Sequence, residues 1–206
     1  MTPKPISRRA EVAVRRLREW APILAILAAC LLLAAGGGEW RELGRYQRDA
    51  IENGEYWRLV SGHLVHLGLG HLWPNVAALV VIGALFDDVL DNAGWWRATL
   101  ASAAAIDLGL YWLEPNVLWY VGLSGVLHGF VAAGALALLL RRQPLGAVLA
   151  IGLGGKLAFE QIVGPVPFTA ASVGGPVVVA AHLYGAAGGA LAEAVARIVG
   201  RWRSRV

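Results

Sequence analysis

Long apolar runs alternate with short polar segments along this chain of 206 residues. A helix needs about 20 predominantly apolar residues to cross the hydrocarbon core of a bilayer. Six stretches approach this length: residues 21–38, 72–90, 95–113, 124–140, 145–163 and 176–199. The longest polar segment, residues 39–70, separates the first two. The pattern predicts an all-α membrane protein of six transmembrane helices, with a loop outside the membrane between spans one and two.

Composition favours the same class and excludes others. Hydrophobic residues make up 57% of the chain and charged residues 16%, whereas soluble domains carry about 25% charged residues. A soluble protein of this size could not bury so much apolar surface. The basic residues gather at the two ends of the chain rather than along a groove, which argues against nucleic acid as a partner. The one cysteine, Cys30, excludes an internal disulfide.

The distribution of lysine and arginine predicts the orientation. Thirteen of them lie in the two terminal segments and near the connections that follow spans two and four, and four lie in the loop after span one. Positively charged residues are enriched on the cytoplasmic side. We therefore expect basic cytoplasmic segments at residues 1–20 and 200–206, with both termini in the cytoplasm.

The first apolar stretch has an alternative interpretation. The sequence Leu27-Ala28-Ala29-Cys30, after a basic segment and an apolar run, imitates the cleavage box of a lipoprotein signal peptide. The chain stays apolar after Cys30 instead of turning polar, so we favour an uncleaved first span in which Cys30 is a small apolar residue.

A candidate nucleophile begins the fourth span, in Gly122-Leu123-Ser124-Gly125. Glycines allow another chain to approach the serine closely. The unpaired N–H groups of a helix's first turn stabilise negative charge beside it. Such an arrangement suits a serine nucleophile with a backbone oxyanion donor. The motif alone is weak, because glycine occupies 26 of the 206 positions.

A candidate base lies in the sixth span. At 100° per residue, His182, Gly185 and Gly189 fall on one narrow helical stripe, which allows close helix approach. Ser124 and His128 share a similar stripe of otherwise small residues in the fourth span. The two stripes could pack tightly enough to bring Ser124 within hydrogen-bond reach of His182. The glycines serve helix packing under this interpretation and under a purely structural one.

Other histidines offer further candidates. His71 and Asn75 share a helical face and could donate to a developing oxyanion, with Pro74 tolerated in the first turn. His63, His66 and His71 could instead bind a metal, but their spacing matches no ordinary zinc site and no acidic residue lies near them. A structural alternative is that these histidines only hydrogen-bond neighbouring helices.

Four blocks resemble the rhomboid family in order and spacing. They are Trp57-Arg58, the run from His66 to Asn75, Gly122 to Gly125, and His182 with Gly185 and Gly189, and they span about residues 55–190. Rhomboids are six-span intramembrane serine proteases with a Ser–His dyad that opens to the periplasm. The resemblance implies one rhomboid-like transmembrane domain over residues 1–206, in a bacterial inner membrane, with no cofactor and no metal.

The resemblance also implies residue roles. Ser124 would be the nucleophile and His182 the general base and then acid. His71 and Asn75, with the Ser124 N–H, would form the oxyanion hole, and His66 would be a structural histidine beneath the first loop. Gly122 and Gly125 would support the nucleophile. The sequence reveals no third acid, so packing or a neighbour such as His128 must set the tautomer of His182.

For four charged or polar residues the sequence does not decide on one role. Rhomboids commonly carry an aromatic residue at the position of His128, where it stacks on the catalytic histidine. His128 therefore orients His182, carries a second proton or only packs, and we favour the orienting role. Lys156 and Glu160, spaced i, i+4, form a structural ion pair or a contact that governs substrate access. Asp107 has no partner that the sequence identifies.

The string from Gly122 to Gly129 is similar to the rhombosortase branch of the family. That branch is associated with exported proteins that end in a Gly-Gly motif, a hydrophobic span and a basic tail, so such membrane-anchored proteins and the lipid bilayer are the expected partners. A general rhomboid protease of other single-span substrates and a non-catalytic rhomboid-like escort protein are the alternatives. A transporter would predict inverted repeats or charges along several spans, and neither is evident.

Overall fold

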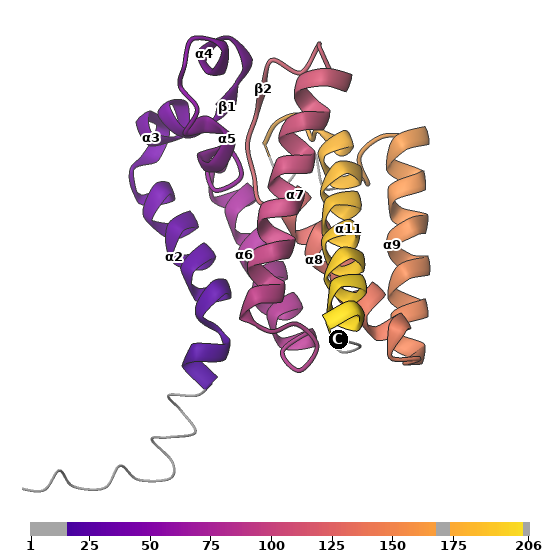
Figure 1. The fold of residues 1–206 in the computed structure, drawn as a ribbon. Coiled ribbons are helices and arrows are strands. Elements are labelled where there is room, and N and C mark those ends of the chain that lie inside the picture. The colour runs from indigo at the N-terminus through magenta and orange to yellow at the C-terminus, as the bar shows by residue number, and fades with distance from the viewer. Residues whose placement is uncertain (1–15, 168–173, 204–206) are drawn as a thin grey trace, which may run out of the picture.

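The computed structural model describes residues 16–167 and 174–203. Most of the predicted basic N-terminal segment and the end of the basic tail lie outside the described residues. Long helices run side by side as a bundle (Figure 1). They are α2 (Ala21–Ala35), α6 (Leu69–Leu85), α7 (Asn92–Leu113), α8 (Ser124–Leu140), α9 (Pro144–Ile162) and α11 (Val179–Arg203). The predicted all-α class agrees with this bundle, and the helices follow the predicted stretches in order with ends shifted by a few residues.

Length and hydropathy alone identify few of these helices as membrane-crossing. Within the described part of the chain, only α9 is both long and apolar enough by itself. The pair α2 and α3 (Gly37–Gly44) meets the requirement together, but the two helices meet at an angle of 119°. α6 and α8 are apolar but have only 17 residues each. The six-span topology therefore remains a prediction.

The first predicted span ends earlier than expected. We predicted a stretch to residue 38, but α2 ends at Ala35 and the chain turns sharply at Gly37, whose φ is 64°. Glycine adopts a positive φ without the steric penalty of a side chain, so this position suits the bend. The polar helix α3 then leads into the loop instead of continuing α2.

The loop forms a small layer over one end of the bundle (Figure 1). It contains β1 (Tyr46–Gln47), α4 (Arg48–Glu52) and α5 (Arg58–Ser61). β1 pairs antiparallel with β2 (Trp119–Tyr120), with Tyr46 opposite Tyr120, which ties the loop to the segment before α8. The buried Arg58 donates to the Glu42 and Arg45 carbonyls at 2.8 and 2.9 Å. These contacts fix the loop beside the start of α8.

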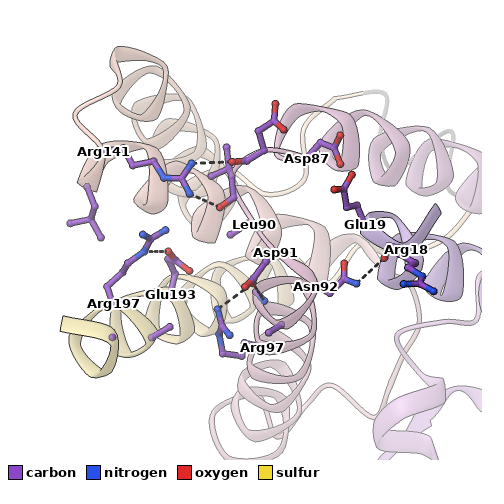
Figure 2. A pocket seen from close by; sticks show the side chains of 17 residues that line it. Arg18, Glu19, Asp87, Leu90, Asp91, Asn92, Arg97, Arg141, Glu193 and Arg197 are labelled. Carbon is purple, nitrogen blue, oxygen red and sulfur yellow. Dashed lines mark hydrogen bonds and ion pairs between the residues drawn. The ribbon is translucent and has the colours of Figure 1, made fainter. Parts of the chain in front are cut away.

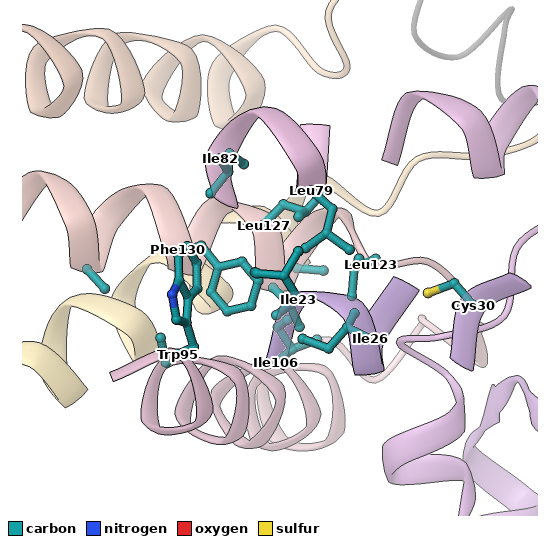
Figure 3. Close-up of a cluster of buried hydrophobic side chains, with 14 of the residues drawn as sticks. Ile23, Ile26, Cys30, Leu79, Ile82, Trp95, Ile106, Leu123, Leu127 and Phe130 are labelled. Carbon is teal, nitrogen blue, oxygen red and sulfur yellow. The ribbon is translucent and has the colours of Figure 1, made fainter. Parts of the chain in front are cut away.

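α8 is the central helix of the core and contacts α6, α7, α9 and α11. Apolar side chains from α2, α6, α7 and α8 meet in one buried cluster (Figure 3). Within it, Trp95 meets Phe130 edge to face, with ring centroids 5.0 Å apart. α9 is mostly exposed by comparison, and a Cβ added at Gly152, Gly154 or Gly155 would meet no atom within 4 Å. α9 thus packs mainly against α8 and leaves most of its surface exposed.

The end of the bundle opposite the loop layer is rich in charge. A pocket of about 1000 Å³ is lined there by Arg18, Arg97, Arg141 and Arg197 together with acidic residues (Figure 2). The Arg141 guanidinium donates to the backbone carbonyls of the turn after α6, at 3.0 Å each. The four arginines of the first loop lie at the other end, so they are separate in space from the four arginines that line this pocket.

Candidate active site

Ser124 and His182 lie within hydrogen-bond distance, although 58 positions separate them in the sequence. Ser124 is the first residue of α8 and His182 lies near the start of α11. His182 Nε2 is 3.0 Å from Ser124 Oγ, and the imidazole is buried. A hydroxyl and an imidazole at this distance can exchange a proton.

Glycines allow α8 and α11 to approach this closely. A Cβ on Gly185 would overlap the carbonyl oxygen of Gly125, and a Cβ on Gly189 would overlap that of Gly129. Gly185 and Gly189 of α11 therefore face the backbone of α8 directly. This contact sets the separation of the two helices, and with it the separation of Ser124 and His182.

The turn before α8 is shaped by Gly122, whose φ is 117°. Its N–H donates to the Gly62 carbonyl at 2.9 Å, and its own carbonyl accepts from the Tyr120 hydroxyl at 2.6 Å. A Cβ on Gly122 would lie 2.6 Å from Cε1 and 2.7 Å from Nε2 of His71. The His71 ring is therefore packed against the backbone that leads to Ser124.

His71 and Asn75 are both buried and line the same cavity as Ser124 and His182. The Asn75 amide donates to the His71 carbonyl at 2.8 Å, which leaves its second N–H for another acceptor. Our placement of Pro74 was wrong. α6 begins at Leu69, so Pro74 lies in the second helical turn, where it removes one backbone hydrogen bond instead of occupying a position without a partner.

His128 stacks on His182. The ring centroids are 4.2 Å apart and the ring planes differ by 12°. His128 Nδ1 lies 2.7 Å from the Ser124 carbonyl oxygen. Because that oxygen can only accept, Nδ1 carries the hydrogen and the ring is tied to its own helix. This geometry is the one expected of an orienting residue.

The sequence identified Glu160 as the partner of Lys156 but not as a partner of His182. Its Oε2 lies 2.9 Å from His182 Nδ1, and its Oε1 lies 2.7 Å from the Lys156 ammonium. The expectation that no third acid is evident is therefore corrected, because a carboxylate meets His182 on the side opposite Ser124. The i, i+4 spacing revealed the pair with Lys156, but the contact with α11 depends on how two helices are rotated against each other.

The remaining histidines lie beside the site. His66 Nδ1 is 3.0 Å from the Leu64 carbonyl, and the ring meets His71 edge to face at 5.0 Å. Burial, with His71 nearby, lowers the pKa of His66 to about 3, so the ring is neutral. His63 Nε2 lies 3.2 Å from Asp107 Oδ1, which supplies the partner that we could not identify for Asp107.

The side chains of the site are poorly arranged to bind a metal ion. His128, Glu160 and His182 offer ligand atoms within 4.8 Å of one another. The two imidazoles are nearly parallel, however, so their ring nitrogens do not converge on one point as tetrahedral ligands do. The Lys156 ammonium also occupies one oxygen of the carboxylate. The arrangement suits proton transfer better than metal coordination.

A cavity of about 740 Å³ contains these groups and extends away from them between α6, α8 and α9. Polar side chains gather at the Ser124 end. The rest of the wall is apolar, and includes Ala78, Ile82, Leu127, Leu149 and Leu153. Such a cavity can hold an extended or helical apolar segment with one backbone carbonyl near Ser124.

Comparison with known proteins identifies relatives. A family model described as the Rhomboid domain matches residues 53–198. The protein named "Putative rhomboid protease YdcA" of Bacillus subtilis (strain 168) is 26% identical over 152 residues, which cover 74% of this chain and 73% of that protein. "Rhomboid protease GluP" of the same organism is 26% identical over 145 residues, 68% of this chain but only 25% of that longer protein. The range that the family model matches, residues 53–198, contains the positions of Ser124, Glu160 and His182.

Proposed function

The chain belongs to the rhomboid family of membrane-embedded proteins, and we propose that it is an intramembrane serine endopeptidase with Ser124 as nucleophile and His182 as general base. The observation that carries this proposal is the 3.0 Å contact between Ser124 Oγ and His182 Nε2 inside a largely apolar cavity. Relatives named as rhomboid proteases support the activity. An escort protein without catalysis would not need this pair.

The reaction follows from the geometry. His182 Nε2 takes the proton of Ser124 as Oγ attacks the carbonyl carbon of the scissile bond. The resulting oxyanion is held by the Ser124 N–H, His71 and Asn75, which line the same cavity. The imidazolium then gives its proton to the leaving amine and the C–N bond breaks. His182 then takes a proton from water as the water oxygen attacks the acyl carbon, and it returns this proton to Ser124 Oγ as the C–O bond of the acyl-enzyme breaks.

The substrate that we propose is a membrane-anchored protein cut near a Gly-Gly motif that precedes its C-terminal hydrophobic span. Glycine lowers helix stability by about 1 kcal/mol per residue relative to alanine, so such a segment unwinds easily and exposes a carbonyl. The apolar cavity wall between α6 and α9 suits the adjoining hydrophobic span. This specificity corresponds to the rhombosortase branch.

We further propose that six helices cross a bacterial inner membrane, with both termini in the cytoplasm and the cavity open to the periplasm. The arginines at the end of the bundle shown in Figure 2 support this orientation, because positive charge is favoured on the cytoplasmic side. The loop layer lies at the opposite end (Figure 1), and Ser124 begins α8 just after β2, which pairs with β1 of that layer.

The test uses the protein reconstituted in liposomes with a reporter that carries Gly-Gly, a hydrophobic span and a basic tail. We expect cleavage near the glycines, identified by mass spectrometry, and complete loss in Ser124→Ala and His182→Ala. Ser102→Ala is the control, because Ser102 is a buried serine of α7 that does not line the cavity. Cleavage by Ser124→Ala would overturn the proposal, and equal cleavage of a reporter with Leu-Leu would overturn its Gly-Gly specificity.

A further inference from the structure

Glu160 contacts His182 on the nitrogen that does not face Ser124. We propose that Glu160 is a positioning residue that completes a hydrogen-bonded triad of Ser124, His182 and Glu160. The inference rests on the proposed protease function and adds a third member to the Ser–His pair. A charged residue of α9 would then support catalysis by Ser124 of α8 and His182 of α11.

The contact fixes the tautomer of His182. A carboxylate oxygen can only accept, so the 2.9 Å contact requires a hydrogen on His182 Nδ1. Neutral imidazole carries one hydrogen, and Nε2 is therefore left as the acceptor for the Ser124 hydroxyl. Only this tautomer can remove the serine proton. When Nε2 takes that proton, the imidazolium lies beside the Glu160 carboxylate, which stabilises its charge.

Burial gives the contact its strength. The Glu160 side chain is 2% exposed, and a buried carboxylate is costly unless it is paired and hydrogen-bonded. Its two oxygens serve two different partners, since Oε2 meets His182 and Oε1 meets Lys156. Lys156 is 38% exposed and neutralises the carboxylate without competing for the oxygen that His182 uses. The ion pair thus supports the triad.

If Glu160 and Lys156 formed only a structural ion pair, removing the carboxylate would not affect cleavage more than removing it from another such pair. The chain contains a second pair that serves as a matched control. Glu193 in α11 is 4% exposed and pairs at i, i+4 with Arg197, which is 38% exposed. This pair reproduces the spacing and burial of Glu160 and Lys156, but it lies in the pocket at the opposite end of the bundle. The variants Glu160→Gln and Glu193→Gln therefore remove the same charge from similar surroundings.

The experiment measures steady-state cleavage of the liposome reporter. We expect Glu160→Gln to lower kcat by about 10²- to 10⁴-fold with KM changed less than about threefold, because an amide cannot enforce the tautomer or stabilise the imidazolium. Glu193→Gln should keep kcat within about twofold. The double variant Lys156→Met/Glu160→Gln leaves no unpaired charge, and we expect it to stay as slow as Glu160→Gln. Glu160→Asp should recover part of the rate.

A second readout follows the hydrogen itself. In protein with ¹⁵N-labelled histidine, the Nδ1–H signal of His182 should be present in Ser124→Ala and absent or strongly shifted in Glu160→Gln. Near-normal kcat in Glu160→Gln, or recovery in the double variant, would overturn the triad while Ser124→Ala still tests the protease. If Glu160→Gln does not fold, judged by its Tm in detergent, the double variant provides the same comparison.

Discussion

His128 lies flat against His182, with ring centroids 4.2 Å apart and planes within 12° of parallel. The first ring is held by its 2.7 Å contact with the Ser124 carbonyl, on the same helix as the nucleophile. The second is held between Ser124 and Glu160. The stack therefore restricts rotation of the His182 imidazole, which must accept a proton from Ser124. This restriction comes from contact between the two ring faces rather than from a hydrogen bond.

His128→Phe should preserve function, because a phenyl ring keeps the flat contact without any group that transfers protons. We expect kcat within about fivefold of wild type for His128→Phe and a loss of about tenfold or more for His128→Ala, which frees the His182 ring. Reporter cleavage in liposomes measures both. If His128 carries a proton in the reaction, the phenylalanine variant will be as slow as the alanine variant.

Gly185→Ala should move His182 on α11 away from Ser124 on α8. The new methyl group would overlap the Gly125 carbonyl, so α11 must move away from α8 and carry His182 from Ser124. We expect cleavage to fall at least about 100-fold, since small displacements of reacting groups cost that much, together with a lower Tm. Gly200→Ala in the same helix is the control, because a Cβ there meets no atom within 4 Å. Equal activity of the two variants would contradict this account of the packing.

Gly122→Ala combines backbone strain with a steric clash. A side chain at φ 117° is strained, by about 1–3 kcal/mol, and the methyl group would lie 2.6 Å from the His71 ring. Gly54→Ala carries comparable strain at φ 98° but meets no atom within 4 Å. We expect Gly122→Ala to lose at least about tenfold in kcat and Gly54→Ala to cleave normally. Similar losses in both would assign the effect to strain alone.

Local sequence patterns predicted those features of the site that depend on the arrangement of side chains within one helix. Helical periodicity predicted the face shared by Ser124 and His128 and the stripe formed by His182 and Gly185. The small residues beside them predicted a close contact between the two helices. The Glu160 contact with His182 could not be predicted in this way. It depends on the rotation of α9 about its axis, which its weakly amphipathic sequence does not determine.

The same limit applies to the ends of the helices. The run of Gly36, Gly37 and Gly38 continues an apolar stretch, so hydropathy extended the first span through a position where the backbone turns by 119°. Periodicity likewise gave no partner for Asp107, because His63 reaches it from the loop layer rather than from a neighbouring helix.

The pair of His63 and Asp107 should matter for stability and not for catalysis. Their side chains are 4% and 14% exposed and lie 3.2 Å apart, and neither residue lines the cavity that holds Ser124. Leaving a buried polar group without its partner typically costs about 1–3 kcal/mol, and Asp107→Ala leaves His63 in that state. We expect Asp107→Ala to lower the free energy of unfolding by about that amount, measured by thermal or denaturant unfolding in detergent.

Replacing both members should recover much of this loss, because a buried pair exchanged for apolar residues of similar volume leaves no uncompensated polar group. The double variant His63→Leu/Asp107→Leu should therefore unfold at a higher temperature than Asp107→Ala. Both variants should cleave the reporter within about threefold of wild type when assayed well below their Tm. Loss of cleavage with an unchanged Tm would instead assign Asp107 a role in the reaction. Tyr120 would then be the connecting group, because its hydroxyl donates to the Gly122 carbonyl beside the nucleophile.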